Sequence, residues 1–93
     1  MSDKQPPEAY LRAAEMLGRR VEIRRRELDM TQEELAEKAG ISRNQVQNIE
    51  KNRNNSKDPE TGRPGPANAR LDTVFRLAYA LELEVVDLIS PSA

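Results

Sequence analysis

The chain has 93 residues, which is enough for one small domain and too short for two independent cores. It contains no cysteine and no histidine, which excludes a disulfide scaffold, a thiolate zinc site and the commonest general base and metal ligand. Fifteen Lys and Arg against sixteen Asp and Glu give a net charge of -1, which by itself argues neither for nor against a nucleic-acid partner.

The distribution of residue types along the chain is more informative than the totals. Basic residues outnumber acidic ones six to three over positions 41–70, whereas positions 1–40 hold eight and nine. No segment approaches the eighteen apolar residues of a membrane span, and positions 1–7 lack the apolar stretch of a signal peptide. We therefore expect a cytoplasmic protein without membrane contact.

A long first helix is predicted after a tail of residues 1–7, which we expect to be disordered. Pro7 followed by Glu8 is typical of a first helical turn. One stripe of this helix has the three- and four-residue spacing of a core-facing surface, formed by Leu11, Ala14, Leu17, Val21 and Leu28. Arg25 falls on the same stripe, so it should have an anionic partner elsewhere in the fold. Met16 and Ile23 lie on another face, either packed under the tail, which we favour, or in a subunit contact.

Two short helices follow, each with a capping signal at its start. Thr31 and Glu34 have the spacing of a capping box, and Gly40 suits the left-handed backbone that ends a helix. Ser42 and Gln45 repeat the device only two residues later. Helices of about eight residues are unstable alone, so these two must pack against each other and against the first helix.

The segment from Asn52 to Arg70 is predicted to be a long loop, because it lacks Val, Ile, Leu, Met and Phe and holds three of the six prolines. Helical spacing then resumes with Leu71, Val74, Leu77, Ala78 and Leu81. A short last helix is expected over 85–89, before Pro91 and a C-terminal tail of residues 91–93. The prediction is an all-α domain over 8–90 with an inserted loop at 52–70.

The helix that begins at Ser42 exposes an unusual set of side chains. Val46 and Ile49 define its buried face, Asn44, Gln47, Asn48 and Lys51 lie opposite, and Arg43 projects from the first turn. Amide and arginine side chains match base edges in the major groove by paired hydrogen bonds. The alternative is a neutral polar surface, but the short two-helix unit before this face favours DNA recognition.

Several segments together resemble the helix-turn-helix family of Cro and the phage repressors. They include Met30-Thr-Gln-Glu-Glu-Leu-Ala36, Ala39-Gly-Ile-Ser42, Val46, Ile49-Glu50 and Leu71-Asp-Thr-Val74. The resemblance covers about 65 residues by our count. It implies a compact, five-helix, lambda-repressor-like domain whose third helix enters the major groove of double-stranded DNA. It also implies that Gln32 contacts a phosphate and that Arg25 pairs with Glu50.

The resemblance has departures at its turns. The family commonly has glycine after its third helix, at Asp29 and at Glu82, and only a few residues where this chain has the 52–70 loop. Glu84 stands where a Ser or Thr cap is usual. With these departures in view, we predict base-reading contacts from Arg43, Asn44, Gln45, Gln47 and Asn48. We predict phosphate contacts from Thr31, Gln32, Ser42, Lys51, Arg53 and Lys57. The loop that carries Arg53 and Lys57 either runs near phosphate or is a passive, disordered spacer.

The expected function is that of a sequence-specific transcriptional regulator, with repression as the favoured mode. The alternative is a protein-interaction module on the same fold, such as an antitoxin. We expect no enzyme activity, cofactor, metal site or catalytic residue, because the paired carboxylates are explained by capping and solvation. We also expect a homodimer on a palindromic operator, with Val86 and Ile89 in the C-terminal helix at the interface. A singly exposed valine is the alternative for Val86.

Overall fold

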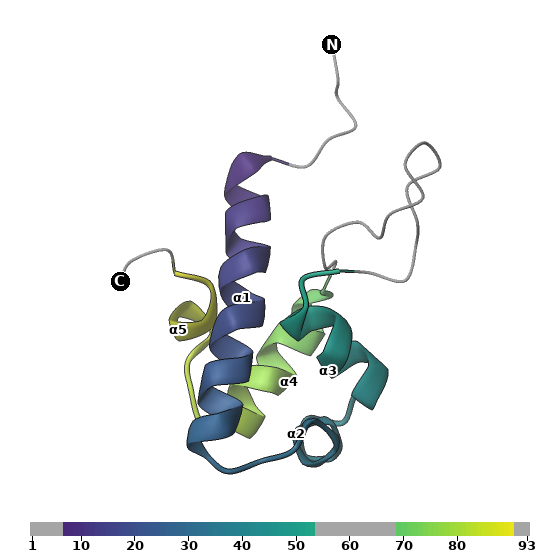
Figure 1. Ribbon diagram of the computed structural model, residues 1–93. Helices are drawn as coiled ribbons and strands as arrows, with labels where there is room; N and C mark the ends of the chain where they lie inside the picture. Colours follow the sequence, from purple (N-terminus) through teal and green to yellow (C-terminus); the bar gives the residue numbers. More distant parts are fainter. Residues whose placement is uncertain (1–6, 54–68, 91–93) are drawn as a thin grey trace.

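A computed structural model describes residues 7–53 and 69–90 as five helices, with no strand among these residues. The helices are α1 (Glu8–Glu27), α2 (Gln32–Ala39), α3 (Arg43–Glu50), α4 (Leu71–Leu81) and α5 (Val85–Ile89). Helix α1 runs the length of the molecule, with α2, α3 and α4 on one side and α5 on the other (Figure 1). The predicted all-α architecture is confirmed. No helix in the described residues is long and apolar enough to span a bilayer.

The starts of α2 and α3 are fixed by the two predicted capping boxes. The Thr31 hydroxyl accepts from the Glu34 amide at 3.0 Å, and the Glu34 carboxylate accepts from the Thr31 amide at 2.8 Å. Ser42 and Gln45 make the same reciprocal pair at 3.1 and 2.9 Å. Each box satisfies two backbone donors that have no partner within the helix. The chain can therefore end one helix and start the next within three residues.

The ends of α1 to α4 share one geometry, in which a residue with positive φ is followed by a backbone bond back to the helix. The left-handed positions are occupied by Asp29, Gly40, Asn52 and Glu82. In α2, for example, the Ile41 amide donates to the Ala36 carbonyl at 3.0 Å. The turns at Asp29 and Glu82 thus keep a left-handed backbone without glycine.

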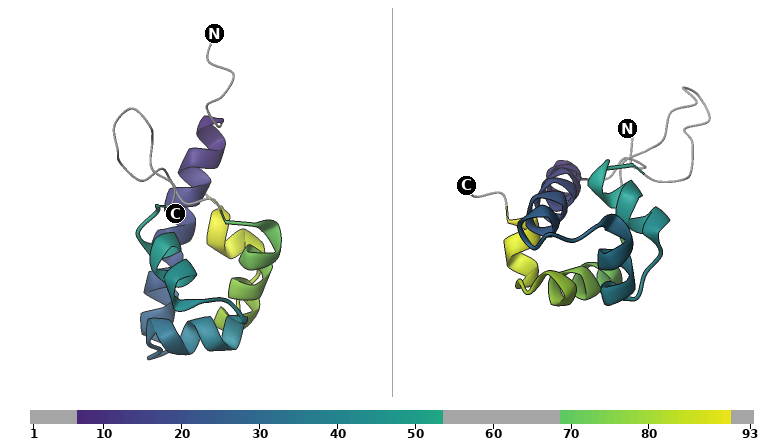
Figure 2. Two further views of the ribbon diagram at one scale, coloured as in Figure 1. Left: turned by 90° about the vertical axis from the view of Figure 1, so that its right-hand side faces the viewer. Right: turned by 60° about the horizontal axis from the view of Figure 1, so that its bottom comes forward.

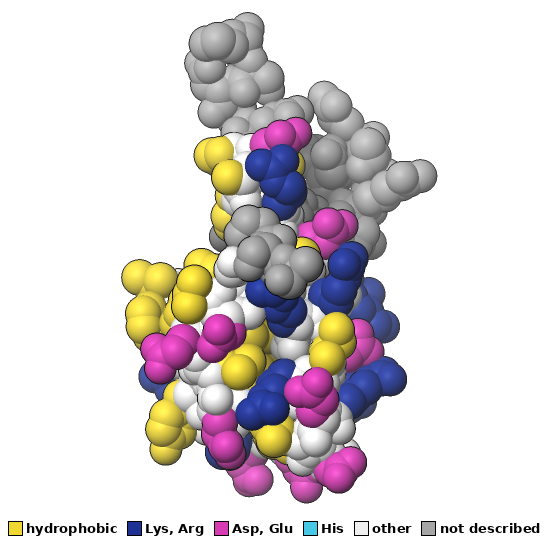
Figure 3. Space-filling view, turned by 90° about the vertical axis from the view of Figure 1, so that its left-hand side faces the viewer, with side chains coloured by type: hydrophobic (Ala, Val, Ile, Leu, Met, Phe, Trp, Pro, Cys, Tyr) yellow, Lys and Arg dark blue, Asp and Glu magenta, His cyan; other side chains and the backbone are white. Residues whose placement is uncertain are grey.

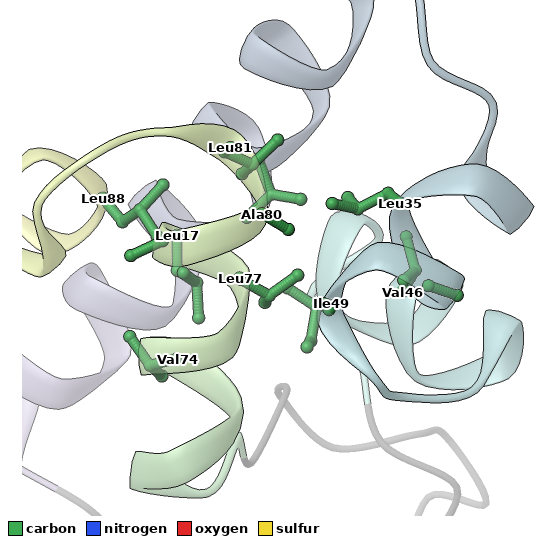
Figure 4. Packing of buried hydrophobic residues seen from close by; sticks show 13 residues of the cluster. Leu17, Leu35, Val46, Ile49, Val74, Leu77, Ala80, Leu81 and Leu88 are labelled. Atoms are coloured by element: carbon green, nitrogen blue, oxygen red, sulfur yellow. The ribbon is translucent and has the colours of Figure 1, made fainter.

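The core is aliphatic and draws on all five helices (Figure 4). Its fully buried large side chains are Leu35, Leu77, Leu81, Leu88, Val21 and Val46. Gly18 lets α1 approach α3 closely, because a Cβ there would collide with the backbone carbonyl oxygen of Ile49. Two arginines of α1 also hold the C-terminal ends of α4 and α5, since Arg24 donates to the Leu81 carbonyl at 3.0 Å and Arg20 to the Asp87 carbonyl at 2.9 Å.

Two residues that the sequence assigned to the inner face, Leu11 and Leu71, lie further out. Leu11 is 37% exposed, because the first turns of α1 extend beyond the other helices (Figure 1). Leu71 is 73% exposed, since it opens α4 on the side that faces away from the core. Ile89 is 37% exposed at the end of α5. Ile23 is exposed as well, and the tail proposed to cover it lies outside the described residues.

Candidate nucleic-acid interface

Helices α2 and α3 form a corner at the edge of the molecule, with the first turn of α3 directed outward (Figure 2). Val46 and Ile49 turn into the core, at 0% and 4% exposure. Arg43, Asn44 and Gln45 occupy the first turn of α3 and are exposed. Because a helix N-terminus also concentrates unpaired backbone N–H groups and a positive dipole, this turn suits an electron-rich ligand surface.

Asn48 does not lie on the exposed face where the periodicity placed it. It is 9% exposed, and its amide lies between two neighbours. Its Nδ2 donates to Asn44 Oδ1 at 3.1 Å, and its Oδ1 accepts from Arg53 Nε at 3.1 Å. The physical reason is the turn after α3, which brings Arg53 back over the helix and covers the Asn48 side chain. Asn48 therefore contacts the exposed first turn of α3 through Asn44.

The residues predicted to contact phosphate differ in their exposure. Thr31, Ser42 and Lys51 are exposed, whereas Gln32 and Arg53 are half-buried. Lys57 lies outside the described residues. Gln47, predicted to read a base, is half-buried beside Asn48. Thr31 and Ser42 are the two N-caps, and Thr31 lines the same surface hollow as Arg43.

A buried ion pair anchors the α2–α3 unit to α1. Arg25 donates through Nε and Nη2 to the two oxygens of Glu50 at 2.7 and 3.1 Å, and the side chains are 10% and 3% exposed. Arg25 Nη1 also donates to the Met30 carbonyl at 2.7 Å. The hydrogen bond that Arg25 donates to Glu50 raises the pKa of Arg25, although burial opposes the shift. The structure thus contains the pair that the resemblance implied.

Gln32 joins this network, which the sequence did not predict. Its Nε2 donates to Glu50 Oε1 at 2.9 Å, so the carboxylate that holds Arg25 also orients the first residue of α2. The residue proposed to touch phosphate is therefore hydrogen-bonded to a buried carboxylate. An arginine on a core stripe was the only sequence signal for such a network.

A second surface feature was missed by sequence reasoning. Leu71, Phe75 and Tyr79 are 73%, 57% and 76% exposed and follow one another at four-residue steps along the outer face of α4. Val86 of α5 is 61% exposed and lies against the same groove as Phe75 and Tyr79. The signal was present in the four-residue spacing of these apolar residues, but the helical pattern predicted an inner-face position for Leu71 and gave no assignment for Phe75 or Tyr79.

The chain matches one family model and several solved structures. Residues 21–61 match the helix-turn-helix family model. SinR in the SinR/SinI protein complex is similar at 24% identity and a TM-score of 0.64, over 81% of this chain and 61% of that chain. The present chain thus spans less than two thirds of that SinR protein. No curated protein sequence matches the chain.

Two further solved structures have the same fold. SinR in complex with DNA, a protein of Bacillus subtilis, has 24% identity and a TM-score of 0.63 over 80% of this chain and 98% of that one. The restriction-modification controller protein C.AhdI from Aeromonas hydrophila has 27% identity and a TM-score of 0.61 over 81% and 94%. Residues 21–61 therefore match the helix-turn-helix family, in line with the resemblance to Cro and the phage repressors that the sequence indicated.

Proposed function

We propose that the protein is a sequence-specific, double-stranded DNA-binding transcriptional regulator that represses by occupying its operator. The observation that carries the proposal is the exposed first turn of α3, where Arg43, Asn44 and Gln45 stand on a capped helix end. A helix of this size fits the major groove, and these side-chain types hydrogen-bond base edges. The family match over residues 21–61 and the SinR–DNA complex support this function.

The proposed contacts divide by chemistry. Arg43, Asn44 and Gln45 approach base edges, and Gln47 and Asn48 stand behind them on α3. Thr31, Gln32, Ser42, Lys51, Arg53 and Lys57 are proposed to approach phosphate. Phosphate contacts position the protein without reading sequence, whereas base contacts give specificity. The function is therefore one of binding, and no step of it calls for a catalytic residue.

The same proposal includes a homodimer on a palindromic operator. One domain reads a single half-site with few base contacts, and two-fold pairing doubles them across half-sites about 34 Å apart. Val86 is exposed for such a contact, and Ile89 lies partly exposed one turn away. Figure 3 shows hydrophobic side chains interleaved with charged ones on the face that carries α5.

Selection of binding sites from random duplexes tests the proposal. We expect enrichment of a palindrome by the wild-type protein and loss of preference at one base pair by Arg43→Ala. A reporter with the selected site placed across its promoter should fall in expression when the protein is present. If the folded wild-type protein enriched no sequence, the proposed function would be wrong.

A protein-interaction function is the second candidate, favoured by the exposed apolar stripe of Leu71, Phe75 and Tyr79 on α4. Monomeric proteins seldom leave large apolar side chains grouped on one helix face without a partner. Such a partner would occupy α4 and leave α3 available to DNA. Binding-site selection and a search for bound proteins with a Tyr79→Asp control separate the two candidates, since that variant should keep its DNA preference.

A further inference from the structure

Glu50 connects the end of α3 to the start of α2. It is the last residue of α3, and its side chain is 3% exposed. Its Oε2 accepts from Arg25 Nε at 2.7 Å, and its Oε1 accepts from Arg25 Nη2 at 3.1 Å and from Gln32 Nε2 at 2.9 Å. Because Gln32 is the first residue of α2, one buried carboxylate holds both ends of the helix-turn-helix.

The chemistry of Glu50 fixes the orientation of the Gln32 amide. A carboxylate that is ion-paired with a guanidinium offers only acceptors. Gln32 therefore has to turn its NH₂ group toward Glu50, because its amide oxygen would meet a second acceptor at a site with little water. An NH₂ group carries two hydrogens, and the bond to Glu50 uses one of them. This bond thus restricts where the second hydrogen can point.

Arg25 holds the main chain at the same place. Its Nη1 donates to the Met30 carbonyl at 2.7 Å, and Met30 directly precedes the N-cap Thr31. Gln32 directly follows that cap and is bonded to Glu50. The ion pair therefore holds the backbone before the cap and the side chain after it.

Arg25 also cancels the charge of the carboxylate. DNA phosphate is an anion, so an unpaired carboxylate bonded to Gln32 would repel the group that Gln32 is proposed to bind. The guanidinium lies 2.7 Å from the Glu50 carboxylate, and the pair as a whole is neutral. Phosphate oxygens accept hydrogen bonds, so Gln32 can bind them only through its N–H groups. The orientation that Glu50 imposes and the neutrality that Arg25 restores thus suit the same contact.

We infer that Glu50 is a positioning residue for the contact between Gln32 and a DNA phosphate, and that Arg25 makes this carboxylate compatible with the DNA backbone. The inference rests on the proposed function and adds to it two residues that need not touch DNA. Phosphate contacts carry no sequence information. The network should therefore set the affinity for all duplexes alike and leave the base preference of α3 unchanged.

The first test uses the free protein and needs no DNA. In NMR spectra of side-chain amides, Glu50→Gln should shift the NH₂ resonances of Gln32, because a neutral acceptor replaces the carboxylate. Glu27→Gln is the matched control, since it removes the same charge from an exposed pair with Arg24, and it should leave the Gln32 resonances in place. Gln32 resonances that ignored the loss of the Glu50 charge would overturn the inference, whatever the protein binds.

The second test measures how much Gln32 contributes to DNA affinity in two backgrounds. In the wild-type protein, Gln32→Ala should lower the affinity for the selected operator and for an unrelated duplex about tenfold. In the Glu50→Gln background the same change should cost less than about twofold, because Gln32 is no longer held in its orientation. Any charge effect of the released Arg25 is present with and without Gln32, so it cancels from this comparison. Lys51→Ala removes another proposed phosphate contact and is the control, which should cost the same factor in both backgrounds.

Glu50→Asp is an independent variant that keeps the charge and draws the carboxylate away from Gln32. It should reduce the effect of Gln32→Ala in the same way, and it replaces Glu50→Gln if that variant does not fold by circular dichroism. An equal loss from Gln32→Ala in both backgrounds, or no loss in the wild-type protein, would refute the inference and leave the base contacts of α3 in place. If the wild-type protein bound no duplex, the proposed function would fail, and the free-protein spectra would still decide whether Glu50 holds Gln32.

Discussion

Arg25 keeps a charge on the core-facing stripe of α1 because Glu50 meets it with both carboxylate oxygens. Its pKa is raised chiefly by this hydrogen bond, so the guanidinium is favoured in the folded state. A raised pKa contributes stability that is complete below the unfolded pKa and is lost only as pH rises through the folded pKa. The contribution of Arg25 is therefore constant at neutral pH and disappears only in strong alkali.

Removal of either partner should destabilise the fold. Arg25→Ala or Glu50→Ala leaves an uncompensated charge at a site where the side chains are 10% and 3% exposed, and should lower the free energy of unfolding by about 3 kcal/mol. Denaturant unfolding should show the double variant to be less damaged than the sum of the single ones. Arg26→Ala breaks an exposed pair with Glu22 and should cost less than about 1 kcal/mol. Strictly additive effects would contradict the coupling.

Arg43 is exposed on the first turn of α3, on the proposed recognition surface. Arg43→Ala should leave the melting temperature unchanged and remove about 1 to 3 kcal/mol of discrimination at one base pair. Titrations against single-base variants of the selected operator measure this. Gln32→Ala is the contrasting variant, because loss of a phosphate contact weakens all sequences alike. Uniform weakening by Arg43→Ala would place that side chain on the backbone instead.

At the scale of elements, the contact between α1 and α3 reverses the sign of the stability change that helix propensity alone predicts for Gly18→Ala. Glycine in the middle of α1 is unfavourable by about 1 kcal/mol relative to alanine, so propensity alone makes Gly18→Ala stabilising. The structure predicts the opposite sign, because the new Cβ would meet the Ile49 carbonyl and push α3 away from α1.

Gly18→Ala should therefore destabilise the protein by about 1 to 3 kcal/mol, as overpacking of a close contact does. Thermal unfolding followed by circular dichroism provides the measurement. Arg19→Ala, at the exposed neighbouring position, should stay within about 0.5 kcal/mol of wild type. A Gly18→Ala protein more stable than wild type would show that α3 does not approach α1 so closely.

For the whole molecule, the distribution of exposed apolar residues bears on assembly. Val86 lines the same groove as Phe75 and Tyr79, so α4 and α5 together present an exposed apolar surface. The α3 recognition turn contains no such residues. DNA and a partner subunit would thus use different faces of the molecule.

Val86→Asp should yield a folded monomer with much weaker operator binding, since a charge at a two-fold contact meets its own copy. Sedimentation at tens of micromolar, with and without the selected operator, measures the change. Tyr79→Asp tests α4 in parallel. A dimer that survives Val86→Asp but not Tyr79→Asp would move the interface to α4, and a wild-type protein monomeric on and off DNA would refute the dimer.

The sequence by itself determined the features whose causes lie within a few residues. The Thr31 and Ser42 caps each form reciprocal hydrogen bonds with a residue three positions later. Gly40 ends α2 in a left-handed backbone conformation, which is a property of the local chain. The two short helices and their family resemblance follow from these signals. The Arg25–Glu50 pair was also foreseen, because a charge on an apolar stripe demands a partner and the resemblance indicated which one.

Only the tertiary structure decided what each exposed or buried position meets. Periodicity put Asn48 on the outer face of α3, but the chain returns over it after Asn52, and Arg53 covers it. The same reasoning put Leu71 inside, although none of the described elements packs over that side of α4. Helical periodicity gives the direction in which a side chain points around the helix axis. It does not give the residue that packs against that side chain, because that residue comes from a segment elsewhere in the chain. The burial of Asn48, the hydrogen bond from Gln32 to Glu50 and the outward stripe of α4 all depend on such neighbours.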